Sequence, residues 1–375
     1  MGLRPRALAA VGMTADRGRI DARFWRDRRV LLTGHTGFKG SWLSLWLQSL
    51  GTAVSGLSRG VPTNPSLYEV ARVTEGMAGE AFADIRDPDA VSDAIEAAEP
   101  EVVIHMAAQP LVRRSYLDPR ETFETNVIGT VNVLEAVRAR PGVRVVLVVT
   151  SDKCYENRGL ERGYRESDPM GGADPYSSSK GAAELVSASY RRSFFSGPDS
   201  ARLASARAGN VIGGGDWGQE RLVPDIVRAR LDGHSLEIRN PDAVRPWQHV
   251  LNPLSGYLLL AQTLWSSAEV AGGWNFGPPD DDARPVQWIV EQLRARWAGQ
   301  PAWQRDVLPQ PPEARSLKLD SSRARARLGW RPVVGLDAAL DSIVDWHEAL
   351  GDGADMRALT LSQIEHLAAE AVLVP

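Results

Sequence analysis

A tyrosine and a lysine stand four residues apart in the segment Tyr-Ser-Ser-Ser-Lys, at positions 176–180. If this segment opens a helix, Tyr176 and Lys180 lie on one face of it, one turn apart. A lysine ammonium beside a phenol stabilises the phenolate and lowers the phenol pKa, so the pair could exchange a proton with a substrate hydroxyl during its oxidation. The same spacing also occurs by chance on helix surfaces, so the interpretation depends on the other motifs of the chain.

A glycine-rich segment, Thr-Gly-His-Thr-Gly-Phe-Lys-Gly, occupies residues 33–40 between an apolar run and an amphipathic stretch. A dinucleotide-binding fingerprint requires this context between a strand and a helix. Gly34, Gly37 and Gly40 would let the backbone turn tightly and approach a pyrophosphate, whose charge the helix N-terminus favours. The spacing is GxxGxxG rather than GxGxxG, and the alternative is a glycine-rich turn without a ligand.

The end of the second predicted strand bears on the choice of cofactor. NAD-binding folds often place an acidic residue there, which holds the ribose hydroxyls. Here Ser58 and Arg59 occupy the position. Because an arginine could favour the 2′-phosphate of NADP, this position leaves NAD and NADP open. Asp84, at the end of the third predicted strand, is placed either to meet an adenine ring or to cap a surface helix.

The elements that must position these residues follow from hydrophobic periodicity. From residue 24 onwards short apolar runs alternate with amphipathic stretches, a pattern typical of parallel strands joined by helices, so the sequence predicts an α/β fold. The predicted strands span residues 30–33, 53–57, 80–83, 102–105, 145–150 and 203–206, and the predicted helices span 41–50, 88–98, 122–138 and 177–195. After residue 208 the pattern breaks into segments rich in glycine and proline, which are typical of loops.

The composition excludes several classes of protein. The chain has 375 residues, of which 43% are hydrophobic and 24% charged, and its formal net charge is −4. These values argue against a disordered chain and against a basic nucleic-acid binder, and no apolar run is long enough to span a bilayer. One cysteine, Cys154, and scattered histidines predict neither a disulfide nor a metal site, and they fit a reducing cytoplasm.

The length predicts two lobes. We expect residues 24–208 to form a dinucleotide-binding domain and residues 209–375 to form mainly a substrate-binding lobe, part of which returns to the first domain. Residues 1–23 are expected to be a loose extension, because their apolar run at 7–13 is too short for a signal peptide. Four of the 43 basic residues are lysines, and Lys39, Lys153 and Lys180 all fall within candidate motifs, where an amine able to lose its proton is useful.

Five segments together carry a family resemblance: TGHTGFKGSWL, TSDKCYEN, DPYSSSK, RAGNVIGGGDW and RPWQHV. From residue 24 to residue 332 the chain resembles the extended short-chain dehydrogenase/reductase superfamily and, within it, the CDP-glucose 4,6-dehydratases. The resemblance implies a Rossmann-type doubly wound parallel sheet with a smaller C-terminal α/β lobe, and NAD as cofactor. It also implies a hydro-lyase of deoxysugar biosynthesis that converts CDP-D-glucose to CDP-4-keto-6-deoxy-D-glucose and water, by oxidation at C4, elimination across C5 and C6, and return of the hydride to C6.

The resemblance gives catalytic roles to five residues. Tyr176 would take the proton of the C4 hydroxyl with help from Lys180, and Ser151 would share that hydroxyl. Asp152 would protonate the departing C6 hydroxyl, since a buried carboxyl can hold a proton at neutral pH. Lys153 would remove the C5 proton as a neutral amine, and the alternative is that it only contacts substrate oxygens.

The resemblance further implies which residues bind the ligands. The two helical patterns at 122–138 and 177–195 resemble those through which the superfamily forms homodimers. The implied cofactor-binding residues are Gly34, His35, Gly37, Phe38, Lys39, Gly40, Asp84, Ile85, Ala107, Ala108, Gln109, Tyr176 and Lys180. The implied substrate-binding residues are Asn126, Asn210, Trp217, Arg221 and Arg245.

Three other functions remain open. A nucleotide-sugar 4-epimerase would share the cofactor and the Tyr176/Lys180 pair, but it needs no elimination and should lack the Asp152/Lys153 pair. A dehydratase for another NDP-hexose would also eliminate water and would differ in the nucleobase that it recognises; the related dehydratases that act on dTDP-glucose carry glutamate at the position of Lys153. A protein that only senses NAD(P) would show no turnover.

Overall fold

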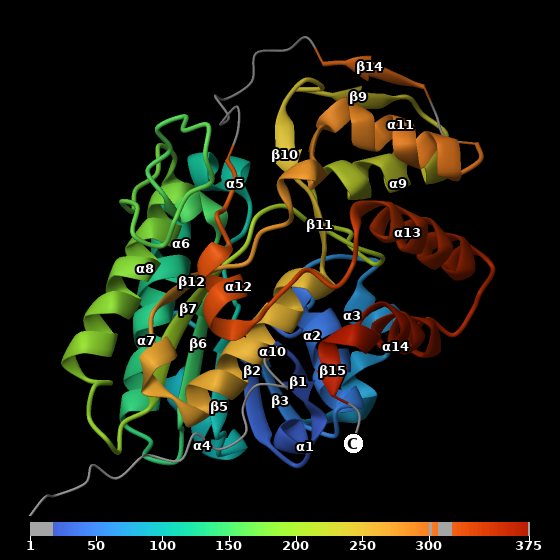
Figure 1. Ribbon diagram of the computed structural model, residues 1–375. Coiled ribbons are helices and arrows are strands. Elements are labelled where there is room, and N and C mark those ends of the chain that lie inside the picture. Colours follow the sequence, from blue (N-terminus) through green and yellow to red (C-terminus); the bar gives the residue numbers. More distant parts are fainter. Residues whose placement is uncertain (1–17, 300–301, 307–316, 374–375) are drawn as a thin grey trace, which may run out of the picture.

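Seven strands form one parallel sheet in the computed structural model, which describes residues 18–299, 302–306 and 317–373 (Figure 1). The strand order is β12-β7-β6-β5-β2-β3-β4, and chain order reverses direction between β2 and β5. Open α/β sheets bind ligands at such a switch point. The parallel sheet confirms the predicted α/β fold. The strands are β2 (Arg29–Thr33), β3 (Ala53–Ser58), β4 (Met77–Phe82), β5 (Val102–His105), β6 (Val145–Val149), β7 (Arg202–Arg207) and β12 (Gly273–Asn275).

The helices of the first half follow the predicted pattern, with local differences at their ends. The predicted helix at 122–138 is the main difference, because the structure divides this run into α6 (Pro119–Phe123), a π-helical turn (Glu124–Ile128) and α7 (Gly129–Arg138). The other three are α2 (Phe38–Ser49), α4 (Pro88–Ala98) and α8 (Pro175–Ser193), and a shorter helix, α5 (Val112–Leu117), precedes α6.

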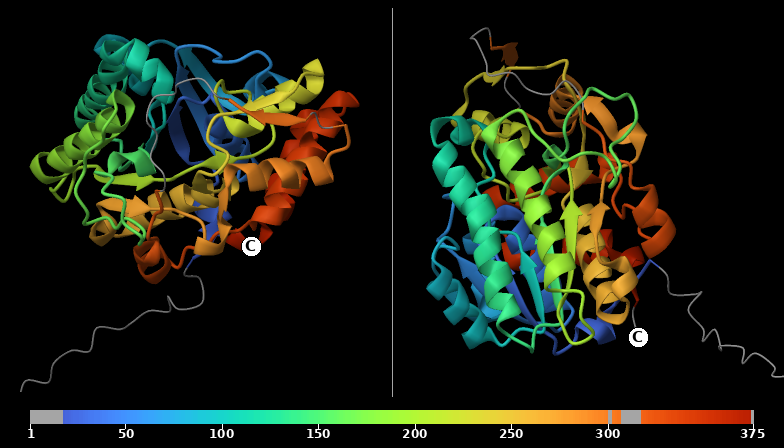
Figure 2. Two further views of the ribbon diagram at one scale, coloured as in Figure 1. Left: turned by 90° about the horizontal axis from the view of Figure 1, so that it is seen from above. Right: turned by 90° about the vertical axis from the view of Figure 1, so that its left-hand side faces the viewer.

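Side chains of the sheet alternate between two hydrophobic cores. Val30 and Leu32 of β2 belong to one core and Leu31 belongs to the other. Successive side chains of a strand point to opposite faces, so both faces of a parallel sheet must be covered. Helices α4, α7 and α8 cover one face, and α2, α10 (Leu251–Ser266) and α14 (Met356–Leu367) cover the other (Figure 2). Trp42 and Trp46 of α2, one turn apart, are fully buried in the first of these cores.

The chain after β7 builds a second group of elements and also returns to the sheet. Strand β12 pairs with β7 at the edge of the sheet. The remaining elements lie mostly at the upper right in Figure 1. They are the strand pairs β8 (Val211–Ile212) with β11 (Gln248–His249), β9 (Leu236–Ile238) with β14 (Trp303–Arg305) and β10 (Val244–Pro246) with β13 (Ala283–Pro285), and the helices α9 (Leu222–Asp232), α11 (Val286–Arg296), α12 (Ser322–Leu328) and α13 (Leu336–Gly351).

The start of the folded chain differs from the expected loose extension over residues 1–23. Residues 1–17 lie outside the described part of the chain. Strand β1 (Ile20–Asp21) pairs in parallel with β15 (Val372–Leu373), and α1 (Ala22–Trp25) follows it. Ile20 and Trp25 are buried in the main core, so ordered structure begins before residue 24. Within the described ranges, no helix is both long and apolar enough to cross a membrane.

Candidate active site

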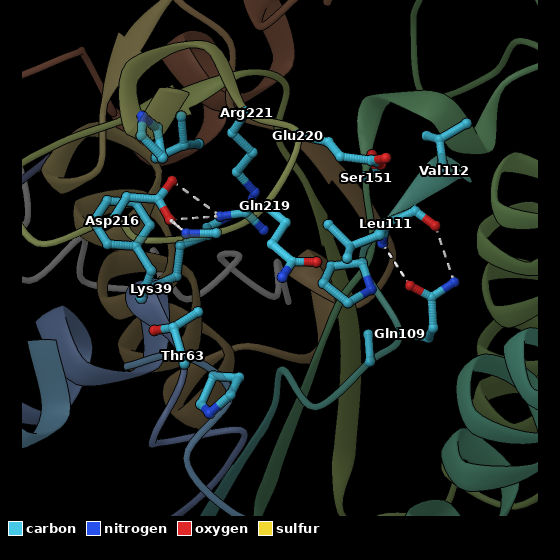
Figure 3. Close-up of a pocket in the computed structure, with 18 of the residues that line it drawn as sticks. Lys39, Thr63, Gln109, Leu111, Val112, Ser151, Asp216, Gln219, Glu220 and Arg221 are labelled. Atoms are coloured by element: carbon cyan, nitrogen blue, oxygen red, sulfur yellow. Dashed lines mark hydrogen bonds and ion pairs between the residues drawn. The ribbon is translucent and has the colours of Figure 1, made fainter. Parts of the chain in front are cut away.

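A cleft of about 1060 Å³ opens at the carboxyl ends of the sheet strands, at the switch point between β2 and β5. The loops that follow β2 to β7 line one side, and residues 215–225 and 236–247 of the second group of elements line the other. Figure 3 shows part of this lining. Nearly all of the residues implied by the family resemblance lie on its surface, and the two exceptions, His35 and Asn126, are described below.

The glycine-rich segment forms the turn between β2 and α2. Gly34 adopts a φ of +78°, which side chains disfavour, and Gly37 precedes the first residue of α2 without any side-chain cap. A Cβ atom on Gly40 would lie 2.0 Å from the Gly34 carbonyl oxygen. The turn therefore depends on glycine, and the uncapped N–H groups at the start of α2 suit a pyrophosphate. Gly37, Phe38 and Lys39 line the cleft beside them.

We predict that Gly40→Ala destabilises the ligand-free protein and weakens dinucleotide binding. The added methyl group would overlap the Gly34 carbonyl, which is backbone and cannot turn aside. Overpacking of this kind costs about 1–3 kcal/mol. Thermal unfolding without cofactor, followed by titration with NAD, measures both effects. Gly37→Ala is the matched control, because its Cβ would lie 3.4 Å from the same oxygen; an equal loss of thermal stability in both variants would contradict the steric explanation.

His35 does not line the cleft, although the resemblance implies cofactor binding for it. Its side chain is fully buried, with Nδ1 2.9 Å from Ser58 Oγ and Nε2 2.9 Å from Glu80 Oε1. Both ring nitrogens are thus engaged below the glycine-rich turn, and the backbone of residue 35 alone is left for a ligand. Cofactor binding at residue 35 therefore stays a prediction for its backbone, and the His35 side chain supports the turn from beneath.

Arg59 and Asp84 form a charged rim at the end of β3 and β4. Arg59 Nη1 lies 3.1 Å from Glu121 Oε1 and 3.8 Å from Asp84 Oδ2. Arg86 also lies 2.7 Å from Asp84, and its hydrogen bond is the main cause that holds the pKa of Asp84 below its usual value. Asp84 lines the cleft beside Ile85, as expected, and Arg59 also lines it while paired with carboxylates.

Gln109 and Asn126 shape the loop after β5. The Gln109 amide exchanges two hydrogen bonds with the Leu111 backbone, at 2.6 and 3.0 Å (Figure 3). Asn126, in the π-helical turn, accepts from Gln109 N and donates to Gln109 O and Ser179 Oγ. Ala107, Ala108 and Gln109 line the cleft, whereas Asn126 is buried behind them. The implied substrate contact of Asn126 is therefore wrong, because its amide is used within the protein.

Ser151, Asp152 and Lys153 follow directly after β6 and line the cleft. Ser151 Oγ donates to Asp152 Oδ1 at 2.9 Å and accepts from Lys153 N at 3.2 Å. Burial raises the pKa of Asp152, although Lys153, these hydrogen bonds and Arg245 oppose the rise. The environment thus favours the protonated acid, in the direction that the sequence predicted.

Tyr176 and Lys180 face this segment from α8, on one side of the helix as predicted. The amines of Lys153 and Lys180 lie 5.9 and 6.0 Å from the centre of the Tyr176 ring. Burial raises the pKa of Tyr176 to about 12, and a hydrogen bond with Ser151 and the charge of Arg221 only partly oppose this. The predicted lowering of the phenol pKa is therefore wrong for the protein without ligands, because burial outweighs the nearby positive charges.

Two lysines share the base of the cleft near Asp152. Burial lowers the pKa of Lys180 to about 8 and that of Lys39 to about 8, and Lys180 and Arg221 further depress that of Lys39. Lys39 Nζ donates to Tyr257 OH at 3.3 Å. Close to neutral pH each amine can therefore change its protonation with little cost in free energy, which is useful in a site that moves protons.

The side of the cleft opposite the glycine-rich turn carries the implied substrate residues. Asn210, Trp217, Arg221 and Arg245 all line it. Arg221 pairs with the buried Asp216 at 3.0 Å, as the dashed lines in Figure 3 show. The sequence reasoning quoted Asp216 within GGGDW without giving it a role. It also missed Arg113 and Glu220, which lie 3.5 Å apart and join α5 to the opposite side. No periodic pattern marks such pairs.

Other expectations concern groups outside the reaction. Cys154 is fully buried, and burial raises its thiol pKa well above the usual value, as suits a packing residue. Among the described residues there is no group of three or more His, Cys, Asp or Glu side chains that could hold a metal ion.

Comparison with known proteins agrees with this geometry. Residues 30–270 match the NAD dependent epimerase/dehydratase family. A CDP-glucose 4,6-dehydratase of Salmonella typhimurium is 51% identical over 342 residues, which cover 90% of this chain and 95% of that protein. A dTDP-glucose 4,6-dehydratase of Xanthomonas campestris is 28% identical over 335 residues, which cover 84% of this chain and 92% of that protein.

Solved structures share the fold. A UDP-glucose 4-epimerase of Thermus thermophilus, in complex with NAD, has a TM-score of 0.72 and 25% identity, covering 85% of this chain and 99% of that one. A dTDP-glucose 4,6-dehydratase of Streptomyces venezuelae, also with NAD bound, has a TM-score of 0.73 and 23% identity, covering 87% and 98%. Both similarities extend over the sheet and the second group of elements.

Proposed function

The chain belongs to the NAD dependent epimerase/dehydratase family, and we propose that it is a CDP-glucose 4,6-dehydratase, a hydro-lyase that produces CDP-4-keto-6-deoxy-D-glucose and water. The observation that carries this proposal is the buried Asp152 with Lys153 beside the Tyr176/Lys180 pair. An epimerase needs only the Tyr176/Lys180 pair, whereas an elimination also needs an acid and a base. The 51% identity to a CDP-glucose 4,6-dehydratase over nearly its whole length points to the same reaction.

NAD fits the cleft through the glycine-rich turn and the uncapped start of α2. When bound, NAD supplies the acceptor and donor for the hydride. Gly34, Gly37 and Gly40 would leave room for its pyrophosphate, and Lys180 would hold its ribose. The remaining residues proposed to line its site are Phe38, Lys39, Asp84, Ile85, Ala107, Ala108 and Gln109.

The protein moves four protons in the proposed reaction, and the last passes from the Lys153 ammonium back to C5 as the hydride reaches C6. Tyr176, as a phenolate that the ammonium of Lys180 stabilises, accepts the proton of the C4 hydroxyl, which Ser151 also contacts. A ketone at C4 acidifies the C5 proton, which Lys153 then removes as a neutral amine. Asp152, whose pKa burial raises, gives its proton to the departing C6 hydroxyl. Each group acts on a separate oxygen or carbon, so one site can serve all the steps.

The nucleotide-sugar diphosphate is proposed to lie against Arg221 and Arg245, with Asn210 and Trp217 beside it. Arginine suits phosphate oxygens because its guanidinium can donate two parallel hydrogen bonds. Arg245 is the stronger candidate of the two, because it lies within RPWQHV, one of the five segments that carry the family resemblance.

Incubation of the purified protein with CDP-, dTDP-, UDP- and GDP-glucose tests the proposal. We expect CDP-glucose alone to give an alkali-labile 4-keto product that has lost one water. Deuterium placed at C4 should appear on the new C6 methyl group. A product of unchanged mass would indicate an epimerase. Turnover of another nucleotide sugar would contradict cytosine as the nucleobase of the substrate.

The protein is further proposed to form a homodimer through α6, α7 and α8, in the cytoplasm. These helices lie side by side on one side of the molecule (Figure 2). Unusually for a protein surface, they expose several large apolar side chains. Those side chains are Phe123 of α6 and Leu185 of α8, together with Ile128 of the π-helical turn before α7 and Phe194 at the end of α8. A second copy of the chain would bury them in a bundle of helices.

We predict that Leu185→Glu yields a monomer in sedimentation experiments, because it would place a charge at the centre of the proposed helical interface. Leu231→Glu on α9 is the matched control, since both leucines are 61% exposed. The control should leave the oligomeric state unchanged. A wild-type monomer, or dissociation in both variants, would contradict this choice of interface.

A further inference from the structure

A buried ion pair lies behind the proposed catalytic residues. Arg207 Nη2 lies 2.7 Å from Glu184 Oε2, and the two side chains are only 5% and 4% exposed. Neither residue lines the cleft, so neither contacts a ligand there. Removing two charges from water is unfavourable unless further hydrogen bonds satisfy them, so the partners of this pair indicate what it holds together.

Glu184 joins the end of β6 to helix α8. Its Oε1 accepts a hydrogen bond from Thr150 Oγ1 at 2.5 Å, and its Oε2 accepts one from Ser205 Oγ at 2.7 Å. Thr150 directly precedes Ser151, and Glu184 follows Lys180 by one turn of α8. The carboxylate therefore fixes the start of the Ser151–Lys153 segment against the helix that presents Tyr176 and Lys180.

Arg207 holds the other end of the same segment. Its Nη1 donates to Tyr155 OH at 2.5 Å, and that hydroxyl donates to Asn275 Oδ1 at 2.7 Å. Tyr155 follows the short 3-10 turn Asp152–Cys154. Strand β12 leaves room for the guanidinium at Gly273, where a Cβ atom would lie 2.3 Å from Arg207 Nη2. The ion pair is thus hydrogen-bonded to Thr150 before, and to Tyr155 after, the residues Asp152 and Lys153.

Glu184 also sets the charge around Lys180. Five titratable groups face Lys180: Tyr176 and Glu184 on α8, Cys154 on the 3-10 turn, Lys39 on α2 and His105 on β5. The groups that face Glu184, besides Lys180, are Arg207, Cys154 and Arg191. Burial keeps Cys154 and His105 neutral, because it raises the pKa of the thiol and lowers that of the imidazole to about 3. Among these groups Glu184 carries the negative charge, since Arg207 and its hydrogen bonds hold its pKa low despite burial.

We propose that Glu184 and Arg207 are positioning residues for the reaction proposed above, on which this role rests. Their ion pair fixes residues 150–155 against α8 and places a permanent carboxylate one turn from the Lys180 ammonium. Neither side chain touches substrate or cofactor. Glu184 keeps Lys180 charged near neutral pH, and the pair together keeps Lys153 and Tyr176 close to each other in the cleft.

The charge effect is tested by titrating the lysines of the full-length protein. The chain has only four lysines among its 43 basic residues, so ¹³C-labelled lysine gives few NMR signals, and Lys180→Arg assigns the relevant one. In Glu184→Gln, which keeps the shape and removes the charge, the titration midpoint of Lys180 should fall by about one pH unit. In Glu184→Asp, which keeps the charge, it should stay close to the wild-type value. Glu135→Gln on α7 is the surface control.

The positioning effect is tested by steady-state kinetics with CDP-glucose. Glu184→Gln should lower kcat by about tenfold or more and change KM by less than about twofold, since misplaced catalytic groups slow the chemical steps without removing a substrate contact. Should this variant fail to fold, as judged by circular dichroism, Thr150→Val removes one hydrogen bond and keeps the ion pair. It should lower kcat severalfold at unchanged KM.

Two results would overturn the proposal: an unchanged Lys180 titration in folded Glu184→Gln, or a wild-type kcat in Thr150→Val. The titration needs no substrate. It therefore remains decisive if the wild-type protein turns over a different nucleotide sugar, an outcome that would contradict the proposed function alone.

Discussion

Replacement of Tyr176 by phenylalanine is expected to lower turnover by about 1000-fold or more, because the first proton of the reaction then has no acceptor. The ring itself should stay in place because it is buried, with the amines of Lys153 and Lys180 at 5.9 and 6.0 Å from its centre. Only the hydroxyl, with its hydrogen bond to Ser151, is lost. Rapid-mixing absorbance of reduced nicotinamide, measured after addition of CDP-glucose, should show no transient signal.

Tyr190 provides the control on the same helix. Its hydroxyl interacts with Glu135 at the far end of α8, and burial raises its pKa to about 12, the same value as for Tyr176. Tyr190→Phe should leave turnover within about twofold of the wild-type rate, as is usual for a change away from the reacting atoms. If Tyr176→Phe still reduced bound NAD at the wild-type rate, the assignment of Tyr176 as the proton acceptor would be wrong.

Several elements of the fold could be predicted because local signals agreed with the final packing. Strand β5 and helix α4 have the predicted bounds, and α4 has a strong start signal in Asp87, which caps the helix, and Pro88. Strand β12 could not be found, because three residues that begin with glycine show no periodicity. Its place in the sheet depends on parallel pairing with β7, a contact far away in the chain. Strand β1 is similar, since only pairing with β15 makes Ile20–Asp21 a strand.

The candidate site shows a similar division. Spacing alone placed Gly34, Gly40 and the Tyr176/Lys180 pair, because a turn and a helix face are local features. The direction in which a side chain points was harder to predict. Asn126 lies outside the five segments that carry the resemblance, and the π-helical turn directs its amide to the backbone of Gln109.

The pKa of Tyr176 differs most from what the sequence indicates. The sequence predicted a lowered phenol pKa from the nearness of Lys180, yet burial raises the pKa of Tyr176 to about 12. Burial cannot be judged from spacing, and here it exceeds the effect of the neighbouring charges. The same holds for the Glu184–Arg207 pair, whose partners come from β6, β7 and α8 and share no motif.

Replacement of Lys153 by methionine is expected to separate the oxidation from the elimination. Methionine has a similar length and no amine, so the C4 hydroxyl should still be oxidised through Tyr176, and reduced nicotinamide should accumulate transiently. The C5 proton would then lack a base, and overall turnover should fall by about 100-fold or more. In deuterium oxide, wild-type protein should incorporate deuterium at C5 of the sugar, whereas Lys153→Met should not, as measured by NMR and mass spectrometry.

Lys318→Met is the control, because Lys318 is the lysine that lies outside the candidate motifs and away from the cleft lining. It should exchange C5 at the wild-type rate. The exchange measurement decides between the two roles open to Lys153, since turnover alone falls in both. If Lys153 only contacts substrate oxygens, its replacement should weaken binding and leave C5 exchange intact at saturating CDP-glucose. If Lys153 is the base, its replacement should abolish exchange at every substrate concentration. Retained exchange in Lys153→Met would therefore make Lys153 a binding residue and require another group as the C5 base.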